Sequence, residues 1–177
     1  MRFVDLLKTT VMLSAGAATM LAVITVVAAT GDNDNALVLI GAGWWLVASL
    51  IGALVGRRAQ VTSAIGRLLA DAKMATMMPA HRPGAVVINR LWPLLVSTIA
   101  AAGLGLLFPQ VPAVACGFAI IWALAWRHQD AAVLAIEERD GVTFFVEPTS
   151  PIRPMRLVRT PGLRREVPTL SSVNGSG

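Results

Sequence analysis

Few side chains in this 177-residue sequence are of the types that do chemistry, and their spacing brings few of them together. The two histidines, His81 and His128, stand far apart, and only His128 has a nearby carboxylate, Asp130. Histidine and carboxylate groups are the usual general acids and bases. A membrane enzyme that acts on lipid would therefore have to use His81, His128 and Asp130. No serine has the glycine context of a nucleophile elbow, and no glycine-rich loop matches a phosphate-binding pattern. We expect no catalytic residue.

Metal and cofactor chemistry is equally weakly indicated. Glu137, Glu138, Asp140 and Glu147 form an acidic cluster, but no histidine or cysteine stands near it at ligand spacing. We interpret the cluster as a solvated face that pairs with arginines. The single cysteine, Cys116, lies inside an apolar run and excludes an intramolecular disulfide. The sequence predicts no metal site and no cofactor.

The composition indicates a membrane protein. Hydrophobic residues make up 55% of the chain, the mean hydropathy is +0.67, and the 14% charged share is about half that of a globular protein. The net charge of +5 does not predict nucleic-acid binding, because the basic residues flank apolar runs and do not form a recognisable binding module. Arginine dominates the basic residues among abundant alanine, valine and glycine, which we interpret as a bacterial coding bias.

Four apolar runs are long enough to cross a bilayer, which takes about 20 residues. None of them contains an ionisable side chain, which argues against a proton- or sodium-coupled transporter. Pro93 is expected in the first turn of the third helix, where its missing N–H costs little. The predicted spans are residues 9–29, 36–56, 91–108 and 112–126.

The first run has a second interpretation. A basic start and Val27-Ala28-Ala29 resemble a signal peptide with a small-residue cleavage site. The apolar stretch is longer than a usual signal core, so we favour a retained helix.

The basic residues predict the orientation. All of them lie before the first run, between residues 57 and 90, or after the fourth run. The positive-inside rule then puts both termini and the 57–90 loop in the cytoplasm of a bacterium, with the four helices in its inner membrane. Trp92, Trp122 and Trp126 fall near the cytoplasmic ends of their helices, as an aromatic belt would. Trp44 and Trp45 lie deeper, and we interpret them as lipid-facing or helix-packing bulk; a lipid or quinone cavity is the alternative.

Small residues recur at the spacing that lets membrane helices approach closely. The first helix contains Ser14 and Ala18, and the second contains Gly52 and Gly56, each pair four residues apart. We expect these residues to pack the helices within the bundle. Oligomerisation, or docking to another membrane subunit, would use the same surface.

The spacing of apolar residues in the 57–90 loop predicts an amphipathic helix that ends at about Met78. This helix could continue directly from the second span. We expect it to lie on anionic headgroups, with Arg57, Arg58 and Arg67 as contacts. A partner surface made of Met74, Met77 and Met78 is the alternative, because methionine suits adaptable interfaces.

The residue pattern of the C-terminal region predicts a small extended appendage. Asp140-Gly141 is a turn signal after a helix that extends to about Arg139, and residues 142–147, rich in β-branched and aromatic side chains, are a strand candidate. A hairpin with residues 133–138 is the alternative. A lone strand is marginal in water, so it should pack on the loop, a second copy or a partner. The proline-rich segment that follows favours polyproline II, which would align Arg153, Arg156 and Arg159 on one edge toward anionic lipid or a partner. We expect residues 170–177 to be a disordered tail.

The resulting expectation is an all-α membrane protein: a four-helix bundle over residues 1–136, an appendage over 137–169 and the tail. The leading functional hypothesis is a non-catalytic protein that acts by association with itself or another membrane subunit, as an accessory, scaffold or assembly component. The second is an oligomeric channel, for which only Thr10, Ser14 and Thr25 of the first helix approach a polar stripe. A membrane enzyme acting on lipid is third.

Overall fold

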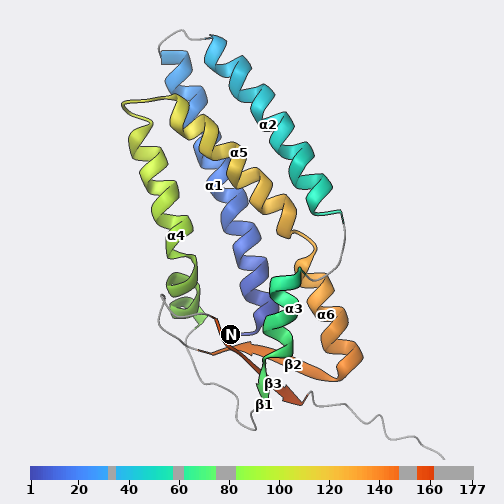
Figure 1. Cartoon of the computed structure of the whole chain (residues 1–177). Helices are drawn as coiled ribbons and strands as arrows, with labels where there is room; N and C mark the ends of the chain where they lie inside the picture. The colour runs from blue at the N-terminus through green and yellow to red at the C-terminus, as the bar shows by residue number, and fades with distance from the viewer. Residues whose placement is uncertain (32–34, 58–61, 75–82, 148–154, 162–177) are drawn as a thin grey trace, which may run out of the picture.

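The computed structural model of the chain describes residues 1–31, 35–57, 62–74, 83–147 and 155–161. Four of its helices are long and apolar enough to cross a membrane, the last of them counted together with the helix that follows it. They account for most of the described chain (Figure 1). Their bounds are α1 Phe3–Gly31, α2 Asn35–Val55, α4 Pro83–Leu104 and α5 Gln110–Trp126.

Helix α5 is the centre of the bundle, because α1 and α2 both pack along it (Figure 1). The contacts use small side chains: Ala18 on α1, Ala48 on α2 and Ala113 on α5 are all buried. Small residues let helix backbones approach closely where lipid supplies no hydrophobic drive for association. The core of the bundle is therefore the three-helix set α1–α5–α2.

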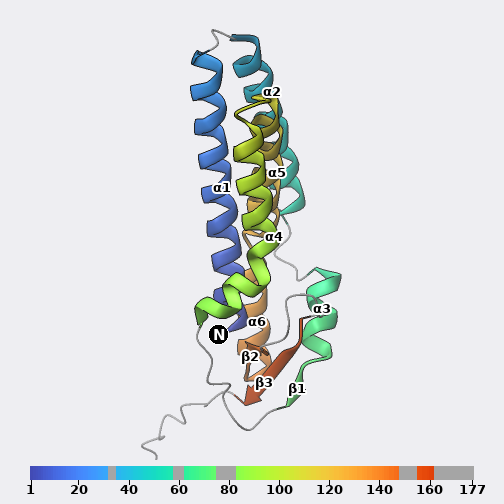
Figure 2. The same cartoon turned by 90° about the vertical axis from the view of Figure 1, so that its left-hand side faces the viewer.

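Helix α4 leans against this core and adds little to it. Of its described side chains only Val86 and Ala101 are buried. Pro93 lies inside this helix, not in its first turn as the sequence predicted, because the helix begins at Pro83 and ends at Leu104. A proline ring clashes with the carbonyl four residues earlier and bends a helix. The lower turns of α4 accordingly swing aside from the bundle (Figure 2).

Below the bundle lies a compact unit that we call the base. It contains a three-stranded sheet in the order β1 (Lys73–Met74), β3 (Leu157–Pro161) and β2 (Val142–Val146), in which β3 runs antiparallel to β2 and parallel to β1. Gly141 ends α6 in the left-handed conformation (φ 63°), which a glycine adopts without strain, and the chain then enters β2. The base comprises α3 Ser63–Ala70, β1 Lys73–Met74, α6 Gln129–Asp140, β2 Val142–Val146, β3 Leu157–Pro161 and the first residues of α1.

The N-terminus is built into the base. Arg2 pairs with Phe145 in an antiparallel bridge, and the Val146 N–H donates to the Met1 carbonyl over 3.1 Å. Phe3 and Leu7 are buried in the same core as Val133, Phe144 and Leu157. Cleavage after Ala29 would remove these N-terminal residues from the core.

The structure confirms the strand predicted at 142–147 and the helix before it, and it contradicts the 133–138 hairpin, since those residues belong to α6. The sheet also makes the all-α description incomplete. The loop helix is wrong in extent: α3 ends at Ala70 and is followed by β1. Its apolar residues Ile65 and Leu69 are buried in the base, so that face is covered by protein. Met77 and Met78 and the tail, residues 170–177, lie outside the described residues.

Candidate functional site

The small residues that the sequence singled out face the inside of the bundle. Ser14 and Ala18 of α1 are both buried, and the Cys116 thiol of α5 donates to the Ala18 carbonyl over 3.2 Å. The Ser14 hydroxyl has no hydrogen-bond partner among the described residues. The expectation that these positions pack the bundle agrees with this geometry.

The glycine pair on α2 contacts the same central helix. A Cβ atom at Gly52 would lie 2.8 Å from Cβ of Leu124 and 3.1 Å from Cα of Ile121, both on α5. A Cβ at Gly56 would collide with the Leu124 carbonyl oxygen. Because real Cβ contacts are longer, only glycine fits at either position in this packing. The spacing predicted close helix contact, and the partner is α5 of the same chain.

Two tryptophans of α2 form hydrogen bonds with α5 at the other end of the α2–α5 interface. The indole N–H of Trp45 donates to the Ala113 carbonyl over 2.8 Å, and that of Trp44 donates to the Val114 carbonyl over 3.1 Å. Both residues therefore pack helices, one of the two roles that the sequence suggested. No periodicity signal could have predicted the hydrogen bonds, because they depend on which helix lies beside α2.

The hydroxyls of α1 do not form a free polar stripe. Thr10, Ser14 and Thr25 are all buried. The Thr10 hydroxyl donates to the Leu6 carbonyl, and that of Thr25 to the Leu21 carbonyl, each over 2.8 Å. Threonine commonly bonds back to its own helix in this way. These two hydroxyls are used by the helix that carries them.

The predicted arginine contacts that lie in the described part of the chain come from separate elements. Arg57 and Arg67 are exposed, at the end of α2 and on α3, while Arg58 and Arg153 lie outside the described residues. Arg156 and Arg159 were expected on one polyproline II edge, which is wrong for the described part: residues 157–161 form β3, and the Glu147 N–H extends the ladder to the Arg156 carbonyl over 3.0 Å. Strand side chains alternate between faces, so positions 156 and 159 point to opposite sides.

Two of the three candidate catalytic groups lie in the described part of the chain. His81 lies outside the described residues, and His128 and Asp130 are half-buried at the start of α6. Within the described part of the chain, no three His, Cys, Asp or Glu side chains group as metal ligands would. Glu137 is the buried member of the acidic cluster, with a side chain that is 5% exposed. Its carboxylate accepts a hydrogen bond from the Arg2 side chain over 2.8 Å and another from the Phe144 N–H over 2.9 Å.

The structure forms a pocket in the base that the sequence did not reveal. This basal pocket has a volume of about 350 Å³. Its apolar part is Leu68, Met155 and Leu157, and its charged part is Asp71, Lys73, Glu147 and Arg156. The residues come from three separate stretches of the chain, so spacing alone could not have grouped them. The described residues supply no ion pair and no side-chain hydrogen bond to any of the four charged groups.

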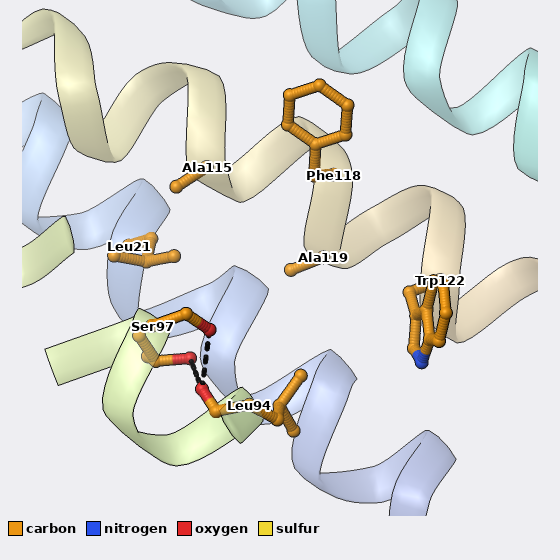
Figure 3. A pocket seen from close by; sticks show the side chains of 8 residues that line it. Leu21, Leu94, Ser97, Ala115, Phe118, Ala119 and Trp122 are labelled. Carbon is orange, nitrogen blue, oxygen red and sulfur yellow. Dashed lines mark hydrogen bonds between the residues drawn. The ribbon is translucent and has the colours of Figure 1, made fainter. Parts of the chain in front are cut away.

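A second hollow opens sideways between α1, α4 and α5, within the apolar part of the molecule. This membrane groove has a volume of about 330 Å³ and exists because α4 leans away from α5. Figure 3 shows Leu21 and Ser97 on one side, and Phe118 and Trp122 on α5. The Ser97 and Thr98 hydroxyls both donate to the Leu94 carbonyl, over 3.0 and 2.7 Å. The lining is Leu21, Leu94, Ser97, Thr98, Ala115, Phe118, Ala119 and Trp122.

Comparisons of this chain with protein-family models, with curated proteins and with solved structures give no match. Four apolar helices indicate a multi-pass membrane protein.

Proposed function

We propose that this protein is a non-catalytic, multi-pass membrane protein that acts by association, as an accessory or assembly component of a membrane complex. The basal pocket is the observation that carries the proposal. Three of its charged residues, Asp71, Lys73 and Arg156, are exposed, whereas its apolar residues Leu68 and Met155 are half-buried and Leu157 is buried. An apolar centre inside a charged rim is the usual anatomy of a protein interface. A partner that brings opposite charges to this rim would supply the missing pairs.

The edge strand β1 is a second feature that supports partner binding at the base. Strand β2 is covered on its outer side by Met1 and Arg2, whereas β1 ends the sheet on the other side. Among the described residues nothing pairs with the outer side of β1. An exposed edge strand is a template for a strand from another chain. Met74, which is 70% exposed on β1, suits such a contact because methionine adapts to varied surfaces.

The proposed setting is the bacterial inner membrane with the base in the cytoplasm. The charge distribution supports this orientation: Arg2, Lys8, Arg57, Arg67 and Arg127 all lie at or near the base end, and the opposite end carries no Lys or Arg. A partner would then be a membrane subunit with a cytoplasmic segment, or a cytoplasmic protein recruited to the membrane.

The channel and lipid-enzyme hypotheses receive less support. An oligomeric channel would need a polar stripe on a helix face that is open to the other copies, and the α1 hydroxyls that approach such a stripe, on Thr10, Ser14 and Thr25, are buried within the chain. The half-buried His128 and Asp130 line neither the basal pocket nor the membrane groove. Loss of function on replacing His128 with alanine would revive the enzyme hypothesis.

The test is purification of tagged protein in a gentle detergent, with the mass of the complex and the identity of its chains measured. We expect a second subunit in fixed stoichiometry. The double substitution Lys73→Glu and Arg156→Glu should remove it, whereas Arg67→Glu, a charge reversal on exposed α3, should not. A homo-oligomer without any second subunit would contradict the proposal and direct work to flux assays in vesicles.

A further inference from the structure

We infer that the partner of the base inserts one lysine or arginine side chain into the basal pocket, where its charged end pairs with Glu147. The inference rests on the proposed function, because it names the chemistry that the partner brings to the same surface. The apolar residues of the pocket, the exposure of its charged groups and the end of α3 beside it all favour this occupant.

The pocket offers room and apolar surface for one long side chain. It lies where the end of α3 meets β1 and the start of β3 (Figure 2). Its volume of about 350 Å³ is near the lower end of the range for ligand pockets. Leu157 is buried there, and Leu68 and Met155 are half-buried. Lysine and arginine cover apolar surface with their methylene stems, so such a stem fits against these three residues.

The exposure of the charged groups favours a cation inside the pocket. Of the four charged residues described there, Glu147 is half-buried, whereas Asp71, Lys73 and Arg156 are exposed. No described residue pairs with the Glu147 carboxylate, although its backbone N–H donates to the Arg156 carbonyl. A carboxylate partly removed from water gains most from a charge-assisted hydrogen bond. An ammonium or guanidinium group from the partner would supply that bond.

The end of α3 attracts a cation as well. Leu68 lies in the last turn of α3, and Asp71 is the C-terminal cap of this helix. The C-terminus of a helix carries a partial negative charge, which favours a cation and disfavours a carboxylate such as that of Asp71. A basic side chain in the pocket would therefore reduce this repulsion in addition to pairing with Glu147.

The two exposed cations determine what flanks the inserted residue. Lys73 on β1 and Arg156 next to β3 line the same pocket, and like charges across an interface are strongly unfavourable. A partner segment with several adjacent basic residues would therefore be repelled. Acidic residues beside the inserted lysine or arginine would instead pair with Lys73 and Arg156. The expected segment is one basic residue between acidic ones.

The experiment is a fluorescence-anisotropy titration of the full-length protein in detergent with short labelled peptides. Each peptide carries a central lysine, arginine or norleucine between glutamates; norleucine keeps the apolar stem of lysine but lacks its ammonium group. We expect the lysine or the arginine peptide to bind about ten times more tightly than the norleucine peptide, the size of one charge-assisted hydrogen bond. A norleucine peptide that binds as tightly as both others would overturn the inference.

Two carboxylate variants separate the pocket from general attraction. Glu147→Gln should lower the affinity of the basic peptide about tenfold, to that of the norleucine peptide, and leave norleucine binding unchanged. Glu138→Gln removes an exposed carboxylate from α6, outside the pocket, and should have no effect. Equal losses of basic-peptide affinity in the two variants would contradict a role for Glu147.

The same measurements distinguish failure of this inference from failure of the proposed association. A second subunit in the purified complex, together with equal binding of all three peptides, would overturn the inference and leave the association standing. A purified homo-oligomer with no second subunit would contradict both.

Discussion

Trp44 of α2 lies directly over Gly117 of α5, so closely that a Cβ atom at position 117 would collide with the indole ring. The same indole donates to the Val114 carbonyl and meets the Phe118 ring edge-on at a centroid distance of 5.7 Å. The absence of a side chain at one residue thus permits a hydrogen bond and an aromatic contact at another. This relationship joins α2 to the central helix.

Replacing Gly117 with alanine should destabilise the bundle by about 1–3 kcal/mol, the usual cost of forcing extra atoms into a packed site. Gly43→Ala is the matched control, because a Cβ there meets nothing within 4 Å. The control should keep or raise stability, since alanine favours a helix over glycine by up to about 1 kcal/mol. Unfolding free energies measured by denaturing-detergent titration would compare the two, and equal values would refute the packing argument.

Gly56→Ala should also lower stability, because its new methyl group meets a backbone carbonyl that cannot move independently of α5. The oligomeric state of the purified protein should stay unchanged, since the contact is within one chain. Gly16→Ala on α1, which has open space around it, provides the control. If Gly56→Ala instead changed the oligomeric state at unchanged melting temperature, the glycine motif would act between chains.

Glu137→Gln should destabilise the base by about 1–3 kcal/mol, because the buried carboxylate accepts from both Arg2 and the Phe144 N–H. The Arg2 side chain is 46% exposed, so solvent screens part of its attraction and the lower half of that range applies. Glu138→Gln, an exposed neighbour with the same charge, should be within about 0.5 kcal/mol of wild type. Thermal unfolding of both variants checks this, and a large effect at Glu138 would contradict it.

Helix α1 should stay attached in the mature protein, because Phe3, Leu6 and Leu7 are buried in the base. Burial of each such side chain is worth about 1.5–3 kcal/mol. The intact mass of the purified protein measures this directly. A mass corresponding to a chain that begins at Thr30 would show that α1 is removed and would contradict this prediction.

Cysteine labelling tests the orientation. In a Cys116→Ala background, Arg67→Cys on exposed α3 should react with a membrane-impermeant reagent only after the cells are opened. Gly31→Cys, at the exposed far end of α1, should react in intact cells whose outer barrier has been permeabilised. The reverse pattern would place the base outside the cytoplasm, against the distribution of arginines.

Local sequence properties predicted the elements whose energetics are local. The transfer of about 20 apolar residues into a bilayer depends little on their neighbours, so four runs sufficed to predict four long helices. The β-branched and aromatic residues at 142–146 predicted β2, and Gly141 marked its start. The error at Pro93 arose because residues 83–88 are apolar enough to extend α4 downward, and tertiary contacts through Val86 favour the bent extension.

Only the tertiary structure decided which surfaces meet. The spacing of Gly52 and Gly56 predicts a close helix contact equally well within one chain or between two, and only the tertiary structure shows that both glycines lie against Leu124 on α5 of the same chain. Strand β3 needed the backbone of β2 beside it, since its own composition also suited polyproline II. Both hollows are made by residues distant in sequence, because the packing of side chains from separate elements determines where space is left.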